Sequence, residues 1–113
     1  MYLTGLNLCQ DALKVKPGDA DALSLMALLE TKLGWPGEAQ RHLAEAVAAA
    51  PADKDVLYRK ATVHALRGER TEAVAALDAA LKQGYSPVLA RQEPDLAALR
   101  DLPGYRTVVA DRR

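Results

Sequence analysis

A period of 34 residues is the feature of this sequence that most constrains its fold. Pro17 and Pro51 are 34 residues apart, and the same offset aligns residues of several other types. The aligned pairs are Asp19 with Asp53, Asp21 with Asp55, Leu23 with Leu57, Ala27 with Ala61, Gly34 with Gly68, Glu38 with Glu72, Ala39 with Ala73, Leu43 with Leu77 and Ala46 with Ala80. Because glycine, proline and acidic residues keep this register along with alanine and leucine, we expect one structural unit to occur twice.

Each unit is predicted to be a pair of α-helices. Asp19 and Asp53 stand where a side chain caps the amino end of a helix, and apolar residues follow at helical spacing. Gly34 and Gly68 are placed to end these first helices in the left-handed conformation. Pro36 suits the first turn of the next helix, because an N–H there would have no helical partner. Stripes of apolar residues mark the second helices: Ala39, Leu43, Ala46 and Val47 in one unit, and Ala73, Leu77, Ala80 and Leu81 in the other.

The apolar residues are mostly alanine and leucine. Half of the 113 residues are hydrophobic, the sequence has no Phe and no Ile, and aromatic residues make up 4%. Alanine and leucine favour helices, whereas sandwiches and barrels are rich in β-branched and aromatic residues. Small side chains at Ala27, Ala39, Ala61 and Ala73 would let neighbouring helices approach closely. The sequence therefore predicts an all-α fold.

The charges of the chain balance, which limits the classes of partner. Lys and Arg number 15, and Asp and Glu also number 15. The chain therefore lacks the cationic surplus of a nucleic-acid-binding protein or of a polybasic membrane patch. The amino end has no basic region typical of a signal peptide, and charges interrupt every apolar stretch that could cross a bilayer. We expect a cytoplasmic protein with a protein or peptide partner, and no contact with nucleic acid or membrane.

The repeated unit resembles the tetratricopeptide repeat (TPR) family. The matching residues are Leu23, Met26, Ala27, Gly34, Ala39, Leu43, Ala46 and Pro51, and then Leu57, Ala61, Gly68, Ala73, Leu77 and Ala80. Leu23 and Leu57 stand in place of the family's Trp, and Glu30 and His64 in place of an aromatic residue. The resemblance implies an all-α, right-handed α-solenoid of antiparallel helix pairs with a short helical C-terminal cap.

On this basis, residues 1–113 are expected to form a single TPR-like domain. Residues 1–18 would be a half repeat, residues 19–52 and 53–86 full repeats, and residues 87–113 the helical cap. Terminal repeats of such an array need cover for the face that has no neighbour.

The first segment aligns with the second helix of a repeat. Residues 2–15 are predicted to be helical, and no first helix precedes them. Their apolar side chains, which would lack part of their cover, are Leu3, Leu6, Leu8 and Leu13. Each buried leucine contributes roughly 1.5–3 kcal/mol. We therefore expect either that more chain precedes Met1 in the natural protein or that self-association through the half repeat covers this edge.

The C-terminal segment is predicted to contain three short helical pieces that begin at prolines. Residues 86–87 form a helix start, and Pro94 and Pro103 each open a further turn. Segment 94–105 is similar to a tail that follows the last repeat of bacterial TPR proteins, which include multidomain kinases and regulators. Its apolar side and that of its flanks are formed by Val88, Leu89, Leu96, Leu99, Leu102, Tyr105, Val108 and Val109. We expect this segment to cap helix 70–83, and the alternative is a docking surface.

The residue pattern predicts no catalytic site. Cys9 is the single cysteine, has no cationic neighbour in the sequence and is interpreted as a small buried hydrophobe. His42 and His64 lie in different helices without a metal-ligand spacing. The repeated Asp pairs lack the glycine and distal glutamate of a calcium loop. We expect no enzyme activity, no cofactor and no bound metal.

Two further features have alternative interpretations. Glu30 and Lys60 replace apolar residues on successive first helices, and either they pair or each extends its charged end to water. Trp35, in the turn before Pro36, is interpreted as a packed turn residue, and the alternative is a ligand anchor.

The family resemblance also implies where a partner would bind. In the family, the first helices line a groove. Its face would carry Asp21, Ser24, Leu28, Thr31 and Lys32, followed by Asp55, Tyr58, Thr62 and Ala65. Tyr58 is the best candidate anchor, because aromatic residues dominate contact energies. The family's chaperone-tail clamp holds a carboxylate with Lys, Arg and Asn, whereas Asp21 and Asp55 occupy that area here, so we do not expect that specialised role.

The function expected from these features is that of a non-catalytic protein–protein interaction scaffold. It would bind a peptide or protein segment in the groove of the first helices, as part of a larger protein. The alternative is a regulatory or sensor segment at the C-terminus of a bacterial signalling enzyme, such as a Ser/Thr kinase or a cyclase. A third possibility is a spacer whose groove binds nothing tightly.

Overall fold

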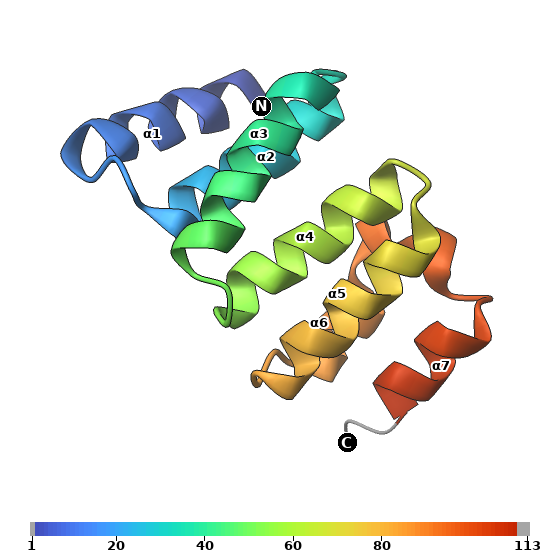
Figure 1. The fold of residues 1–113 in the computed structure, drawn as a ribbon. Helices are drawn as coiled ribbons and strands as arrows, with labels where there is room; N and C mark the ends of the chain where they lie inside the picture. Colours follow the sequence, from blue (N-terminus) through green and yellow to red (C-terminus); the bar gives the residue numbers. More distant parts are fainter. Residues whose placement is uncertain (1, 111–113) are drawn as a thin grey trace. The chain divides into compact units, whose positions relative to one another are not determined.

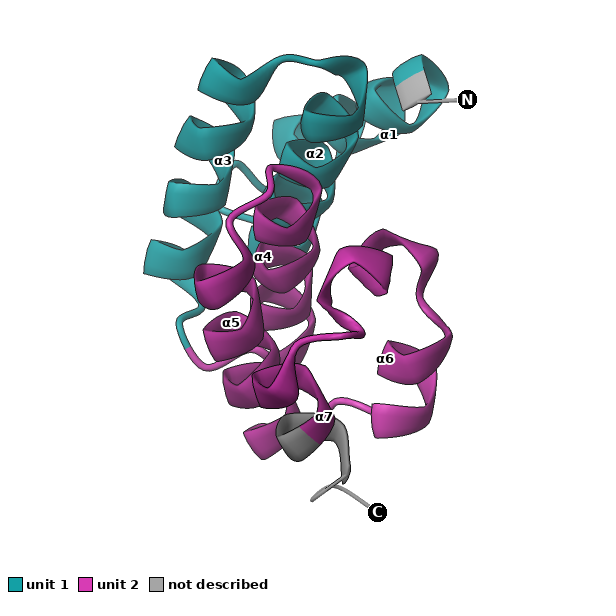
Figure 2. Ribbon diagram, turned by 90° about the vertical axis from the view of Figure 1, so that its right-hand side faces the viewer, with its two compact units in different colours: residues 1–51 teal, residues 52–113 magenta. Residues whose placement is uncertain are grey.

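The computed structural model describes residues 2–110, and every regular element among them is helical. The chain forms two compact units, residues 1–51 and residues 52–113 (Figure 2). The prediction of an all-α fold is thus confirmed for the described residues. The division falls beside Pro51, where the sequence predicts that one repeat ends and the next begins. The assignment of the whole chain to a single domain stays a prediction.

The first unit contains three helices, and the middle one packs against both others (Figure 1). They are α1 (Tyr2–Val15), α2 (Ala20–Leu33) and α3 (Pro36–Ala49). A short turn joins α2 to α3, so these helices run antiparallel. Leu6, Cys9 and Met26 form a buried cluster, with Leu13, Leu25, Leu29 and Leu33 packed against it. The interpretation of Cys9 as a small buried hydrophobe is confirmed.

The first helices of the two predicted repeats begin with the same hydrogen bonds. Oδ1 of Asp19 accepts from the backbone N–H groups of Asp21 and Ala22 at 3.1 and 3.3 Å. Oδ1 of Asp53 accepts from the equivalent groups of α4 (Lys54–Leu66) at 2.8 and 3.2 Å. Both predicted N-caps are therefore confirmed. They leave fewer unpaired N–H groups in the first turn of each helix.

These two helices also end in the same way. Gly34 has a φ of 83° and Gly68 a φ of 77°, a conformation that costs glycine little. In each turn, the residue after the glycine donates its backbone N–H to a carbonyl oxygen of the last helical turn. Trp35 donates to Glu30 at 2.8 Å, and Glu69 donates to His64 at 2.9 Å. Donors and acceptors differ by 34 positions, so the predicted period is present in the local backbone bonding.

The second unit adds three short elements to a helix pair. α4 and α5 (Arg70–Lys82) are followed by α6 (Pro87–Gln92), the 3-10 helix η1 (Pro94–Leu99) and α7 (Pro103–Ala110) (Figure 1). Each of these three begins at a proline, as the sequence predicts, because proline tolerates the first turn of a helix.

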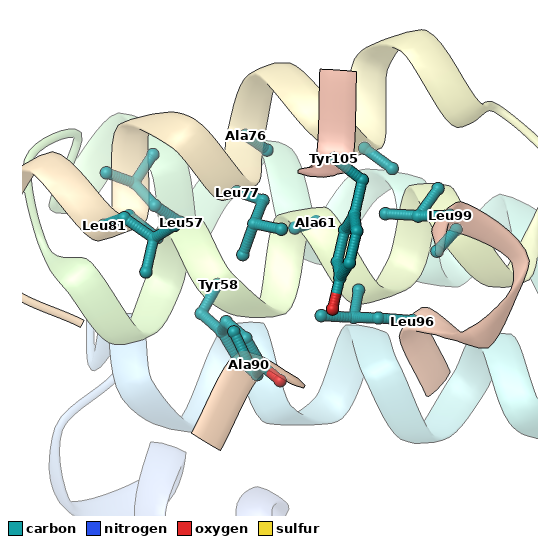
Figure 3. Close-up of a cluster of buried hydrophobic side chains, with 13 residues drawn as sticks. Leu57, Tyr58, Ala61, Ala76, Leu77, Leu81, Ala90, Leu96, Leu99 and Tyr105 are labelled. Carbon is teal, nitrogen blue, oxygen red and sulfur yellow. The ribbon is translucent and has the colours of Figure 1, made fainter. Parts of the chain in front are cut away.

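One core unites all five elements of the second unit (Figure 3). Its buried members are Leu57, Tyr58, Ala61, Ala65, Ala73, Ala76, Leu77, Ala80, Leu81, Ala90, Leu96, Leu99 and Tyr105. η1 packs on both α4 and α5, and α7 packs on α5. The expected cover over helix 70–83 is therefore present, and it also extends over α4, which the sequence did not predict. Of the predicted apolar side, Val88 and Leu89 are half exposed, and the side chains of Val108 and Val109 lie outside the described residues.

Two helical glycines of the first unit give a matched pair of substitutions. An added Cβ at Gly5 of α1 would lie 2.8 Å from Cδ1 of Leu29 in α2, whereas one at Gly37 of α3 would meet nothing within 4 Å. Where it fits, alanine is more stable than glycine by roughly 0.4–1 kcal/mol. We expect Gly37→Ala to raise the free energy of unfolding by about 0.5 kcal/mol and Gly5→Ala to give a smaller gain, because the end of the Leu29 side chain must move, in urea titrations followed by circular dichroism. Equal gains from both would contradict the close approach of α1 to α2.

Candidate functional site

A hollow beside two stacked tyrosines is the candidate site of the second unit. The ring centroids of Tyr58 and Tyr85 lie 3.8 Å apart, and the rings are 11° from parallel. The hollow has a volume of about 260 Å³ and is lined by Tyr58, Tyr85, Leu89, Gln92 and Glu93. Tyr58 is only 8% exposed and belongs to the core (Figure 3), so packing fixes the wall that its ring forms.

The turn after α5 carries Tyr85 onto Tyr58. Gly84 follows α5 with a φ of 103°, and the N–H of Tyr85 donates to the carbonyl oxygen of Ala80 at 3.0 Å. A left-handed glycine of this kind stops a helix and turns the chain. Ser86 then caps the amino end of α6. α6 and the residue that follows it supply the rest of the lining.

The pKa values of both tyrosine hydroxyls are raised, which favours their protonated form. Burial raises the pKa of Tyr58 far above its usual value, and Tyr85, Glu93 and Asp95 act in the same direction. The pKa of Tyr85 is also raised, mainly by burial, although its hydrogen bond with Tyr58 and the charge of Arg59 oppose the shift. The hollow therefore keeps two neutral hydroxyls near carboxylates at physiological pH.

The raised tyrosine pKa values predict that the fold is sensitive to alkali. In the unfolded chain a tyrosine ionises near pH 10, whereas in the folded chain Tyr58 and Tyr85 hold their protons. The stabilisation that they contribute is therefore complete below about pH 10 and is lost progressively as the pH rises further. We expect urea midpoints to fall steeply above about pH 10 and Tyr58→Phe to make the fall shallower. A midpoint that stays constant there would contradict the burial of Tyr58.

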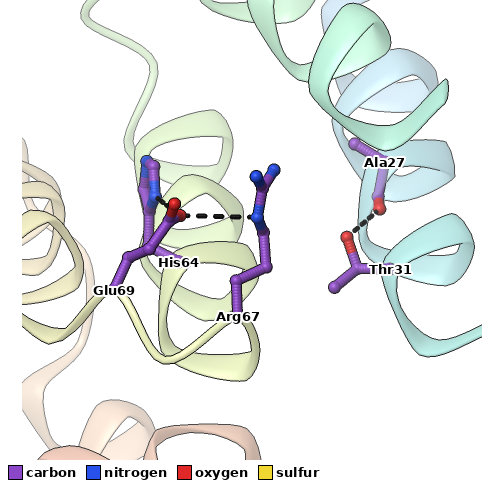
Figure 4. Close-up of polar contacts among 5 residues, drawn as sticks. All are labelled: Ala27, Thr31, His64, Arg67 and Glu69. Atoms are coloured by element: carbon purple, nitrogen blue, oxygen red, sulfur yellow. Dashed lines mark hydrogen bonds and ion pairs between the residues drawn. The ribbon is translucent and has the colours of Figure 1, made fainter. Parts of the chain in front are cut away.

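The predicted groove residues of α2 differ in their exposure. Ser24 is fully buried, and its hydroxyl donates to the carbonyl oxygen of Asp21 at 3.0 Å. The hydroxyl of Thr31 donates to the carbonyl oxygen of Ala27 at 2.8 Å (Figure 4). The exposed or partly buried members are Asp21, Leu28, Thr31 and Lys32. Ser24 thus offers no surface to a partner in this conformation, and binding by the others stays a prediction.

The predicted groove residues of α4 are mostly buried. Tyr58, Thr62 and Ala65 are at most 8% exposed, and Asp55 is partly buried. The hydroxyl of Thr62 donates to the carbonyl oxygen of Arg59 at 2.8 Å. The sequence indicated Tyr58 as an anchor for a partner, but most of its ring is packed within its own chain. A partner could reach it only through the hollow, and its binding role stays a prediction.

Glu30 forms a contact that the sequence did not predict. Its side chain is 6% exposed, and Oε1 lies 2.7 Å from Nδ1 of His42. The interpretation that Glu30 extends its charged end to water is therefore wrong, because its side chain is buried beside His42. Its pairing with Lys60 stays a prediction. Trp35 also differs from its prediction as a packed turn residue, because its side chain is 42% exposed.

A second histidine–carboxylate contact closes the turn between α4 and α5 (Figure 4). Nδ1 of His64 lies 2.8 Å from Oε1 of Glu69, and Nε of Arg67 lies 3.4 Å from the same oxygen. The hydrogen bond with His64 lowers the pKa of Glu69, and the charge of Arg67 adds to this effect. The cluster has the arrangement of a structural ion pair at a helix end.

Within residues 2–110, no group of three or more His, Cys, Asp or Glu side chains could hold a metal ion. None of the described helices has the length and apolar character needed to cross a membrane.

Comparisons with known proteins do not identify a relative. No protein-family model matches the chain, and neither the curated proteins nor the solved structures contain a significant match. The function is therefore inferred from the residues and their geometry.

Proposed function

We propose that the chain is a TPR-like module that binds a peptide or protein segment without catalysing a reaction, and that its helix pairs stack as a right-handed solenoid. The observation that supports this most is the recurrence, 34 residues apart, of one helix start and one helix end. The starts are at Asp19 and Asp53, and the ends at Gly34 and Gly68. Stacked helical repeats of this length create extended surfaces that proteins use for binding.

The surface available for binding on α4 is smaller than the family resemblance implies. Core packing buries Tyr58, Thr62 and Ala65. The hollow at Tyr58 and Tyr85 is concave, holds a volume close to that of one large side chain and lies beside polar groups. Concave sites with a few placed polar groups are where ligands usually bind. We therefore assign partner contact in the second unit to this hollow.

Affinity capture with the full chain tests the proposal. Retained proteins would be purified and titrated against the chain by calorimetry, and we expect at least one to bind with a Kd of about 1 μM, equivalent to roughly 8 kcal/mol. Hydrogen exchange of that complex should show protection in α2, α4 or residues 85–93. The proposal is wrong if no purified candidate binds, or if protection is confined to α3 and α5.

A further inference from the structure

We propose that the hollow beside Tyr58 and Tyr85 is a subsite for one cationic side chain, lysine or arginine, of the bound segment. This inference rests on the proposed function, because it names the chemistry of the partner. The hollow is open, and its volume of about 260 Å³ allows a single long side chain to enter. The lining residues and the surrounding charges both favour a cation.

The lining suits a side chain with an apolar stem and a charged end. Leu89 is 55% exposed and forms an apolar wall, against which the methylene groups of Lys or Arg can pack. Gln92 and Glu93 carry oxygens that accept hydrogen bonds from an ammonium or guanidinium group. None of the lining residues is cationic. A hydrogen bond from a cation to a carboxylate is stronger than one between neutral groups.

The charges around the hollow favour the same ligand. Glu93 acts on both tyrosine hydroxyls, and Asp95 and Asp55 each act on one of them. Arg59 is near enough to Tyr85 to act in the opposite sense. With Arg100, whose Nη2 lies 2.7 Å from the carbonyl oxygen of Glu93, two guanidinium groups stand near three carboxylates, so the potential at the hollow favours a cation over a carboxylate.

Arg100 holds the rim of the hollow in position. Its Nη2 donates to the carbonyl oxygens of Arg91 and Glu93 at 2.9 and 2.7 Å. These bonds tie the end of α6 to the end of η1, so the backbone that carries Glu93 is fixed. A binding site whose backbone is already fixed loses less conformational entropy when the partner binds.

Titrations with short peptides test this subsite directly. The probes are peptides Gly-Gly-Xaa-Gly-Gly, blocked at both ends, in which Xaa is lysine, arginine, norleucine or glutamate. Followed by NMR of the full chain, the lysine and arginine peptides should give saturable shifts at Leu89, Gln92 and Glu93. The norleucine and glutamate peptides should not, because norleucine has the stem without the charge and glutamate has the wrong charge.

Two substitutions and a matched control sharpen the test. Glu93→Gln keeps the size of the side chain and should raise the Kd of the lysine peptide about two- to fivefold. Gln92→Glu adds a carboxylate to the lining and should lower that Kd. Glu72→Gln removes the same charge at an exposed position of α5 and should leave the Kd unchanged. Circular dichroism confirms that each variant is folded.

Several results would overturn the subsite. They are equal shifts from the norleucine and lysine peptides, shifts away from the hollow, no shifts at all, and an unchanged Kd in both Glu93→Gln and Gln92→Glu. Failure of the subsite is distinguishable from failure of the proposed function. If a captured partner bound the Glu93→Gln and Gln92→Glu variants with unchanged affinity, the proposed binding function would be supported and the cation subsite would be wrong. If the lysine peptide bound at the hollow while no protein was captured, the cation subsite would be supported and the proposed binding function would be wrong.

Discussion

Replacing Tyr58 with alanine is expected to lower the free energy of unfolding by about 3 kcal/mol. The ring is 8% exposed and lies in the core of the second unit, so the substitution leaves a cavity. It also removes the stack on Tyr85, and aromatic pairs stabilise beyond their buried area. Urea unfolding followed by circular dichroism measures the change. Since the fold is weakened, this variant cannot separate a loss of binding from a loss of structure.

Tyr58→Phe is the matched control for that substitution. It keeps the stacked ring and removes only the hydroxyl with its hydrogen bond to Tyr85. We expect a loss of about 1 kcal/mol, the usual contribution of one such bond. If the alanine and phenylalanine variants were equally stable, the ring would contribute nothing, and its placement in the core would be wrong.

Leu96→Ala is expected to have an effect of similar size, about 3 kcal/mol. Leu96 lies in η1, is fully buried and belongs to the core that α4 and α5 share. Leu89→Ala is the same change in the same C-terminal segment, but Leu89 is 55% exposed. Its effect should stay within about 0.5 kcal/mol, as is usual for surface positions. Both values come from urea unfolding.

The comparison of these two leucines separates the two interpretations of the C-terminal segment. A segment that caps the helix pair is part of its core, so the two substitutions must differ by several-fold in their effect on stability. A segment that serves as a docking surface and lies loosely on the fold would show small and similar losses. That second result would contradict the core drawn around Leu96 and Leu99 (Figure 3).

The features that could be predicted from the sequence depend on bonds within one helical turn. Asp19 and Asp53 cap helices through N–H groups two and three residues ahead. Gly34 and Gly68 are left-handed because the chain turns at those residues. Such local preferences are fixed by the residue type and its immediate neighbours. The helical content and most element boundaries follow from them.

The contacts that could not be predicted join residues from different elements. Tyr85 contacts Tyr58 because the left-handed turn at Gly84 directs the chain toward α4, and the repeat period in the sequence does not predict the direction of that turn. The sequence suggests Lys60, on the next first helix, as a partner for Glu30, whereas the contact that forms is with His42 in the helix that follows α2. Both contacts depend on how helices pack. Gly84 indicates that the chain turns after helix 70–83, but the pattern does not show where Tyr85 then lies, since Trp35, which follows Gly34 in the same way, is 42% exposed.

The central claim is that the C-terminal segment folds back on α4, so that Tyr85 stacks on Tyr58 and the two rings border a hollow. NMR of the aromatic protons tests it most directly. The ring centroids lie 3.8 Å apart, so we predict strong nuclear Overhauser effects between the two rings, together with ring-current shifts that Tyr85→Ala abolishes at Tyr58. Ring protons of Tyr85 at the positions of an unfolded chain, with no Overhauser effect to Tyr58, would contradict the claim.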